Sequence, residues 1–244
     1  MLNLPAQFRI LGIGKRMLTK KKKLSKKEIK EDKLVELYYK IQAYFEENKN
    51  RIILYAGVLA AVIGAIYLYL NYRSQQNDDA GRYLGQVMDI YDSGSFLEAI
   101  EGKQGTDLIG LKKIVQDYGS TQNGETAKIY LADCYANLGQ KDEALKYYKD
   151  YSGDIDIFVA ASLAGQAGIL SSKDQYKEAA ELYLKASKVS KYDVQDPNYM
   201  LQAAINFIKA GEKDEAKELL ETLKTDYRNS SVYTEINKYE PLVN

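Results

Sequence analysis

The feature that most constrains this 244-residue sequence is an apolar run near its N-terminus. Residues 52–70 contain no charged side chain, and a helix of that length spans about 28 Å, close to the hydrocarbon thickness of a bilayer. Aromatic residues stand near both ends of the run, as in the aromatic belts of membrane helices: Tyr44, Phe45, Tyr67, Tyr69 and Tyr72. A buried core helix is the alternative, but a core helix of this length usually carries polar residues. The run therefore predicts a transmembrane helix over residues 51–72.

The residues around this run argue against a cleaved signal peptide. The 51 residues before it exceed the short basic segment of a signal peptide. The run is also longer than the roughly 7–15 apolar residues of a signal core. Residues 71–74, Asn-Tyr-Arg-Ser, do not show the small-x-small pattern of a cleavage site. We therefore expect an uncleaved signal anchor.

Charge is distributed unevenly on the two sides of the predicted span. Residues 1–51 carry 14 Lys and Arg against 6 Asp and Glu, whereas the remaining residues carry 20 against 28. Because basic residues stay on the cytoplasmic side, the N-terminus is expected in the cytoplasm and residues 73–244 outside it. In a bacterium with two membranes this places the C-terminal domain in the periplasm and the span in the inner membrane. The reversed topology, with a cytoplasmic domain, is the alternative.

Two segments precede the predicted span. Residues 1–24 form a basic N-terminal segment, which is either disordered or attracted to anionic lipid, and its role stays open. Ser25 and Glu28 fit a capping box, which begins a helix by satisfying free backbone donors. Apolar residues then recur at helical spacing from Leu34 to Phe45, which predicts an amphipathic helix over residues 25–50. Its apolar stripe is expected to contact either the membrane or a partner.

The C-terminal part of the chain, residues 73–244, contains internal repeats. Strand-like alternation is scarce there, and similar segments follow one another, such as "YLADCYANLGQKDEALKYY" from Tyr130 and "INFIKAGEKDEAKELL" from Ile205. These segments resemble the tetratricopeptide repeat, in which small residues such as Ala132 and Ala144 let two helices cross closely. Repeat units begin at Ala80, Glu125, Ala160 and Pro197, and the first, weaker unit carries an insertion around residues 101–110. An unrelated helical bundle is the alternative.

The predicted fold is therefore all-α, with a single transmembrane helix followed by a tetratricopeptide-repeat α-solenoid. The repeat domain covers residues 73–244 and holds three to four repeats. Several units are needed because each one buries its apolar face only against its neighbours. Residues 230–239, "SSVYTEINKY", are expected to form a closing helix over the last unit.

The order of these elements resembles a narrower family, the YfgM-like membrane-anchored proteins. The resemblance is carried by "KKEIKEDKLVELYYK", by the span, by the segment from Leu111 to Tyr148 and by "INKYE". It covers roughly residues 26–240 and leaves the first residues outside. The resemblance implies a protein of the bacterial inner membrane that sits beside the Sec translocon and assists newly exported chains.

The sequence lacks the residues of common catalytic and metal sites. It contains no histidine, and its single cysteine, Cys134, can form no intramolecular disulfide. The Gly14–Lys15 pair lacks the other residues of a phosphate-binding loop. We expect no enzyme activity, no metal, no cofactor and no small-molecule substrate. Nucleic acid is not an expected partner, because the basic cluster adjoins the span and residues 52–244 are net acidic.

Protein partners are expected along the concave face of the repeat array. In tetratricopeptide arrays the first helix of each unit lines this face. The candidate binding residues at such positions are Ile129, Asp133, Leu201, Ile205 and Ile208. Apolar side chains there suit apolar segments of a partner. The alternative is that Ile205 and Ile208 pack under the closing helix.

The predicted span carries a second candidate contact surface. Gly57, Ala61, Gly64 and Ala65 lie near one helical face. Small residues on one face let two helices approach closely in lipid, so this face is a candidate site for a partner helix.

Together these features predict a membrane-anchored interaction protein with a chaperone-like role. The expected partners are translocon subunits and newly exported chains. A structural subunit of an envelope assembly, whose repeats hold one fixed partner, is the alternative. A chaperone-like protein would bind many substrates with fast exchange, whereas a structural subunit would hold one partner in fixed stoichiometry.

Overall fold

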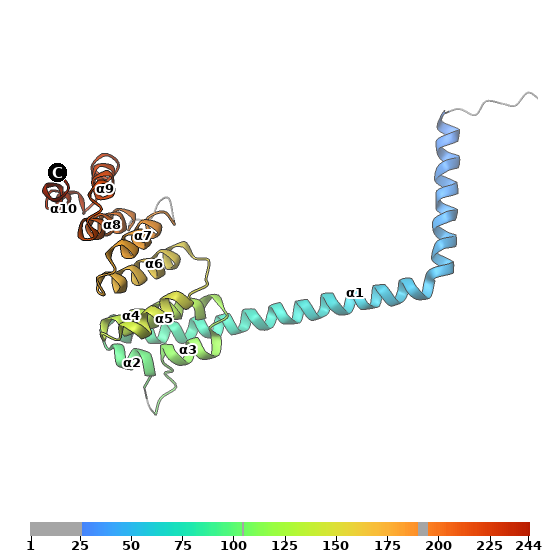
Figure 1. The fold of residues 1–244 in the computed structure, drawn as a ribbon. Coiled ribbons are helices and arrows are strands. Elements are labelled where there is room, and N and C mark those ends of the chain that lie inside the picture. The colour runs from blue at the N-terminus through green and yellow to red at the C-terminus, as the bar shows by residue number, and fades with distance from the viewer. Residues whose placement is uncertain (1–25, 104, 190–194) are drawn as a thin grey trace, which may run out of the picture. The chain divides into compact units, whose positions relative to one another are not determined.

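The computed structural model describes residues 26–103, 105–189 and 195–244, with side chains from residue 33 onward (Figure 1). All regular elements in these residues are helices, which confirms the all-α prediction for the described part of the chain. The chain separates into two compact units, Met1–Ala65 and Ile66–Asn244. The predicted basic segment 1–24 and the capping residue Ser25 lie outside the described residues.

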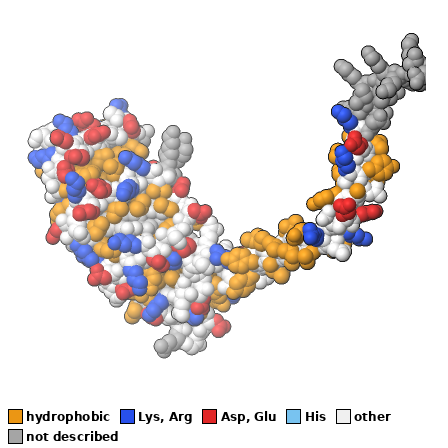
Figure 2. All heavy atoms as spheres, turned by 45° about the vertical axis from the view of Figure 1, so that its right-hand side comes forward, with side chains coloured by type: hydrophobic (Ala, Val, Ile, Leu, Met, Phe, Trp, Pro, Cys, Tyr) orange, Lys and Arg blue, Asp and Glu red, His pale blue; other side chains and the backbone are white. Residues whose placement is uncertain are grey.

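Helix α1 (Lys26–Asp92) contains the apolar run. Among the described helices it is the one long and apolar enough to cross a membrane, and none of its most apolar stretch is buried. Residues 53–70 are exposed without exception, and Figure 2 shows their hydrophobic side chains following one another along the helix. A membrane anchor and a signal sequence share these properties of length and composition.

The second unit, Ile66–Asn244, begins with the last part of α1 and continues as a series of short helices. They are α2 (Phe96–Glu101), α3 (Leu111–Tyr118), α4 (Gln122–Asn137), α5 (Lys141–Asp150), α6 (Asp156–Ser171), α7 (Tyr176–Ala186), α8 (Asp196–Ala210), α9 (Lys213–Asp226), α10 (Tyr233–Ile236) and the 3-10 helix η1 (Glu240–Leu242). Consecutive helices from α3 to α9 pack on one another, and α9 packs on α10 and η1. The result is a stack of helix pairs in chain order (Figure 1).

The same turn joins the two helices of all four predicted repeat units. In each turn a backbone N–H donates to the carbonyl five residues earlier, which satisfies a free carbonyl at the end of the first helix. The four bonds are Ser95 to Ile90 (3.2 Å), Gln140 to Tyr135 (2.8 Å), Gln175 to Leu170 (3.0 Å) and Glu212 to Phe207 (2.9 Å). The residue before each donor has a positive φ: Gly94 (77°), Gly139 (76°), Asp174 (60°) and Gly211 (82°). Four equivalent turns support four repeat units.

Asp174 occupies the position where the other three units have glycine. It is the one described non-glycine residue with a positive φ, a conformation that costs L-residues about 1–2 kcal/mol. Its carboxylate accepts a hydrogen bond from the Tyr176 hydroxyl in the adjoining second helix.

We expect Asp174→Gly to be more stable than Asp174→Ala by about 1 kcal/mol, because only glycine adopts this φ without strain. Both variants lose the carboxylate and its bond to Tyr176, so their difference isolates the backbone term. Urea denaturation of the repeat domain, followed by circular dichroism, measures it. Equal midpoints for the two variants would contradict the prediction.

The crossing of the two helices in the second, third and fourth units is built on pairs of alanines. The pairs are Ala132 and Ala144, Ala167 and Ala179, and Ala204 and Ala216, and all six side chains are fully buried. Small methyl side chains let two helix backbones approach closely, and the first unit has Val87 and Ala99 at the corresponding positions. The expected small residues of the repeat pattern therefore lie at the core of the stack.

The insertion in the first unit lies between α2 and α3. Gly102 and Ile109 form an isolated antiparallel bridge that closes the inserted loop. A Cβ atom on Gly102 would lie 2.5 Å from the Leu108 carbonyl oxygen, and one on Gly110 would lie 2.2 Å from the Ile100 carbonyl oxygen. The two ends of the inserted loop approach each other this closely only because both positions are glycine.

The last part of α1 is bound to the start of α4 by polar contacts. The Arg73 guanidinium donates to the Ser120 carbonyl oxygen (2.6 Å). The Asn77 side chain accepts from the Asn123 backbone N–H (2.8 Å), and the Asn123 side chain donates to the Asn77 carbonyl (2.9 Å). Residues 73–92 of α1 are therefore part of the first repeat unit, with Ala80 and Val87 fully buried in its core.

The array ends in a small apolar cluster. Val232 and Ile236, at 3% and 0% exposure, pack with Leu220 and Leu223 of α9. This is the segment where the closing helix is expected, although α10 itself is only four residues long.

Candidate protein-binding surfaces

The predicted groove residues lie on the first helices of the repeat units, with different exposure. Ile129 on α4 and Leu201 on α8 are each 2% exposed and belong to the core clusters of their units. Asp133, Ile205 and Ile208 are half-buried. The structure therefore places two of the five candidate side chains inside the fold, and the binding role of the others stays a prediction.

Asp133 is held by two tyrosines of its own chain. The Tyr148 hydroxyl of α5 donates to Asp133 Oδ1, and the Tyr91 hydroxyl of α1 donates to Oδ2 (3.4 Å). Burial raises the pKa of the Asp133 carboxyl, although both hydrogen bonds act in the opposite direction. Burial and the carboxylate also raise the pKa of both tyrosines, which stay protonated donors. The carboxylate therefore joins three helices within the array.

The positions of Asp133 and Tyr148, one on each helix of the second unit, are occupied by other residues in the next two units. In the third unit Gly168 takes the place of Asp133, and a Cβ atom there would lie 3.2 Å from the Tyr183 hydroxyl. In the fourth unit Ile205 packs in the cluster that contains Leu220. Pairing between the first and second helix thus uses side chains that the repeat pattern assigns to the groove.

Ile205 and Ile208 pack against two different core clusters, and the one beside Ile205 contains residues near the C-terminal end of the chain. Ile205 packs against the cluster that includes Val232 and Ile236, and Ile208 packs against the cluster of Ala180, Phe207 and Ala216. Val243 contacts both clusters. The position of Ile205 agrees with the alternative interpretation, in which it packs under the closing helix, whereas for Ile208 this stays a prediction.

Helix α6, in the middle of the array, offers the most accessible part of the predicted groove. It has no charged residue after Asp156, and its groove positions carry small side chains. Ile157 is 55% exposed, and four further positions in line with it are half-exposed. We call these five residues the α6 surface: Ile157, Ala161, Ala164, Gly168 and Ser171. An uncharged surface of small residues suits an apolar segment of a partner.

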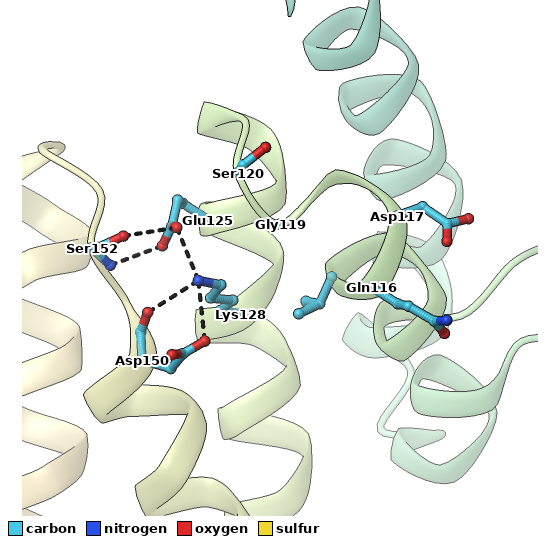
Figure 3. Close-up of a pocket in the computed structure, with 9 residues that line it drawn as sticks. Gln116, Asp117, Gly119, Ser120, Glu125, Lys128, Asp150 and Ser152 are labelled. Atoms are coloured by element: carbon cyan, nitrogen blue, oxygen red, sulfur yellow. Dashed lines mark hydrogen bonds and ion pairs between the residues drawn. The ribbon is translucent and has the colours of Figure 1, made fainter.

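A polar pocket lies where α3, α4 and the end of α5 meet. Its volume is about 580 Å³, and Figure 3 shows Glu125 and Lys128 of α4 facing Asp150 and Ser152. Lys128 Nζ lies 2.9 Å from Glu125 Oε1, 3.0 Å from the Asp150 carbonyl oxygen and 3.2 Å from Asp150 Oδ2. The Ser152 N–H and hydroxyl donate to the two Glu125 carboxylate oxygens at 2.8 and 2.9 Å.

This polar network pairs the Lys128 ammonium with two carboxylates, those of Glu125 and Asp150. The side chains of Lys128 and Glu125 are only 10% and 11% exposed. Burial acts to lower the pKa of Lys128, but the hydrogen bonds and ion pairs with Glu125 and Asp150 outweigh this effect. The pKa of Lys128 is therefore raised. Removing one member of such a pair leaves a buried charge uncompensated. The network therefore connects the start of α4 to the end of α5.

Metal-ligating side chains do not gather anywhere in the part of the chain that the structure describes. No group of three or more acidic, cysteine or histidine side chains there could hold an ion. Cys134 is fully buried, and burial raises the pKa of its thiol to about 12, so it stays protonated at neutral pH. A protonated, inaccessible thiol is neither a nucleophile nor a metal ligand.

Comparison with known proteins identifies the repeats. The tetratricopeptide repeat family matches residues 126–152 and 199–230, which fall within the second and fourth units. No curated protein and no solved structure matches the chain significantly. Tetratricopeptide repeats indicate a protein-interaction scaffold. The two matches and the four equivalent turns together support a tetratricopeptide-repeat protein.

Proposed function

We propose that this chain is a single-pass membrane protein whose repeat domain binds newly exported proteins outside the cytoplasm. The observation that carries the proposal is the uncharged run 52–70, which is exposed along the helix and adjoins the repeat domain. An apolar surface of this size is unfavourable in water and is stable in the hydrocarbon core of a bilayer. The span would thereby hold the scaffold at the membrane surface.

The orientation rests on the charge on either side of the span. Lys and Arg outnumber Asp and Glu by 14 to 6 before Ile52, and the order reverses after it. The positive-inside rule then assigns the repeat domain to the periplasmic side of a bacterial inner membrane. The resemblance to YfgM-like proteins agrees with this location and suggests a place beside the Sec translocon.

The partner class follows from the α6 surface. An exported chain that has not yet folded presents extended apolar segments, and a shallow surface without charge accepts many such segments without strong selection. A chaperone-like scaffold requires this breadth, whereas a structural subunit requires one fixed partner. The small-residue face of the span, with Gly57, Ala61, Gly64 and Ala65, offers a separate contact for a translocon helix.

Orientation is tested by labelling introduced cysteines in intact spheroplasts. We expect Asn229→Cys to react with a membrane-impermeant maleimide, and Lys33→Cys to react only after the membrane is permeabilised. Both positions are exposed, and Cys134 is buried and is replaced by alanine as background. Labelling of Lys33→Cys alone would reverse the topology and exclude the periplasmic role.

Partner choice is tested by photo-crosslinking in living cells from Ala164 on the α6 surface. We expect a range of exported proteins together with translocon subunits. Lys185 on α7 is exposed but lies on a second helix, so a crosslinker there is the matched control. A single dominant partner from Ala164 would favour the structural alternative, and equal products from both positions would remove the α6 surface as the binding site.

A further inference from the structure

The part of α1 that precedes the span carries an apolar stripe to which the proposed function assigns no role. Its six side chains are between 47% and 65% exposed. They are Leu34, Leu37, Tyr38, Ile41, Tyr44 and Phe45. Spaced three and four residues apart, they cover about a third of the helix circumference at 100° per residue. A stripe of this kind on a helix in water needs a covering surface.

The charges beside the stripe are ordered as well. Lys33 and Lys40 are separated by seven residues, which brings both to the same edge of the stripe. Glu36 lies farther from the stripe and pairs with Lys40 at 2.7 Å. Basic side chains along the edge of an apolar face extend their ammonium or guanidinium groups toward anionic headgroups while their stems stay in apolar surroundings.

The position of the stripe limits what can cover it. Phe45 is only seven residues before Ile52, where the apolar run begins, so the stripe stays close to the membrane if the run crosses it. Tyrosine, which occurs twice in the stripe, is enriched at the level of the headgroups. The net positive charge of residues 1–51 adds attraction to the anionic lipids of the cytoplasmic leaflet.

Between the stripe and the span lies a polar segment, residues 46–50. Within it the Asn48 side-chain amide donates to the Tyr44 carbonyl oxygen (3.0 Å), which is also the acceptor of the helical bond at this position. Side chains that share a helical carbonyl favour bending, and a polar segment tolerates water at the broken bonds. A change of helix direction at residues 46–50 therefore costs few hydrogen bonds.

We propose that residues 33–48 lie flat on the cytoplasmic surface of the membrane, with the stripe among the acyl chains and the basic edge at anionic headgroups. This inference rests on the span proposed above. It assigns the apolar stripe of residues 33–48 to a lipid surface rather than to a protein partner. The segment then fixes the depth of the span in addition to the orientation set by charge.

The chain contains no tryptophan, so a single introduced tryptophan reports its own surroundings. The test uses the full chain in nanodiscs that contain anionic lipid, with brominated acyl chains as quenchers. Ile41→Trp places the probe on the stripe. Ala43→Trp places it two residues away, about 200° around the helix, and at almost the same distance from the span. Leu59→Trp places a third probe in the middle of the apolar run.

The expected result is blue-shifted emission for Ile41→Trp and quenching severalfold stronger than for Ala43→Trp. Equal, weak quenching at both positions, with strong quenching of Leu59→Trp, would overturn the inference and leave the span intact. In that case the stripe would be free for a protein partner. Weak quenching of Leu59→Trp as well would show that the run does not enter the bilayer, and the proposed function itself would fail.

Discussion

Replacing Gly124 with alanine is expected to lower the free energy of unfolding of the repeat domain by about 3 kcal/mol or more. A Cβ atom at this position would lie 1.9 Å from the Tyr118 carbonyl oxygen and 2.4 Å from the carbonyl carbon. These are backbone atoms at the end of α3, so they cannot rotate away as a side chain can. Relief requires α3 and α4 to move apart.

That movement would also break the hydrogen bonds of the turn. The Tyr118 carbonyl accepts from both the N–H and the hydroxyl of Thr121, each at 2.8 Å. The Thr121 hydroxyl oxygen in turn accepts from the Gly124 N–H (3.1 Å) and caps α4. Loss of such a cap alone costs about 1 kcal/mol.

Gly85→Ala is the control for this experiment. Gly85 lies inside α1, and no atom outside its own helix lies within 4 Å of a Cβ atom placed there. Alanine is preferred over glycine in a helix by about 0.8–1.0 kcal/mol, so this variant should match or exceed the original stability. Urea denaturation of residues 73–244 compares the two. A Gly124→Ala midpoint equal to that of Gly85→Ala would refute the steric argument.

Asp133→Ala is expected to cost about 2–4 kcal/mol, because it leaves two hydroxyls of the core without their acceptor. Tyr148 is only 4% exposed, so the substitution removes the acceptor of a buried tyrosine. Asp133→Asn retains an acceptor oxygen and should cost less. Thermal unfolding of the two variants beside the original protein gives the order. Equal losses would mean that the contact depends on the charge.

The charge on Asp133 also gives this contact a pH dependence. Burial raises the carboxyl pKa above its ordinary value of 3.8, so the native state binds a proton more tightly than the unfolded chain. The stabilisation from this proton is complete below the unfolded pKa and is lost as the pH rises through the native pKa. The original protein should therefore lose stability relative to Asp133→Asn as the pH rises from below 3.8 to neutral. A stability difference between the two proteins that does not change with pH would contradict this prediction.

The repeat architecture could be predicted because its constraints are local and recur. The alanines at the helix crossings, such as Ala132 and Ala144, and the turn glycines Gly139 and Gly211 all occupy the predicted positions. Their spacing was sufficient to locate a repeat unit even where one residue departs from the pattern. Asp174 adopts the glycine conformation because the two helices around it are held by the same packing as in the other units.

The contacts of the candidate groove could not be predicted in the same way. The repeat pattern assigns Asp133 to a groove position, but its direction depends on Tyr91 and Tyr148, which come from other helices. Ile129 is apolar, and an apolar residue at such a position is equally compatible with a core and with a binding surface. The sequence contains no signal that distinguishes these two environments.

Contacts between residues far apart in the sequence could not be predicted either, because they depend on how separate helices pack. The bonds between Asn77 and Asn123 join residues 46 positions apart, and neither residue belongs to the repeat pattern. The division of the first unit into α2 and α3 follows from Gly102 and Gly110, whose close approach becomes evident only when the loop is closed. Insertions keep no register with the repeat, so their geometry cannot be inferred from it.

The unbroken helix from Ile66 to Asp92 has a consequence for proteolytic shedding. Proteases cut extended backbone, which exposed loops and termini supply and helices do not. Between the end of the apolar run and the first repeat the chain offers no such segment, and Arg73 and Asn77 hold it against α4. Release of an intact soluble domain would require local unfolding of the first repeat. With the run 52–70 as the proposed anchor, this helix would resist proteolytic release of the repeat domain from the membrane.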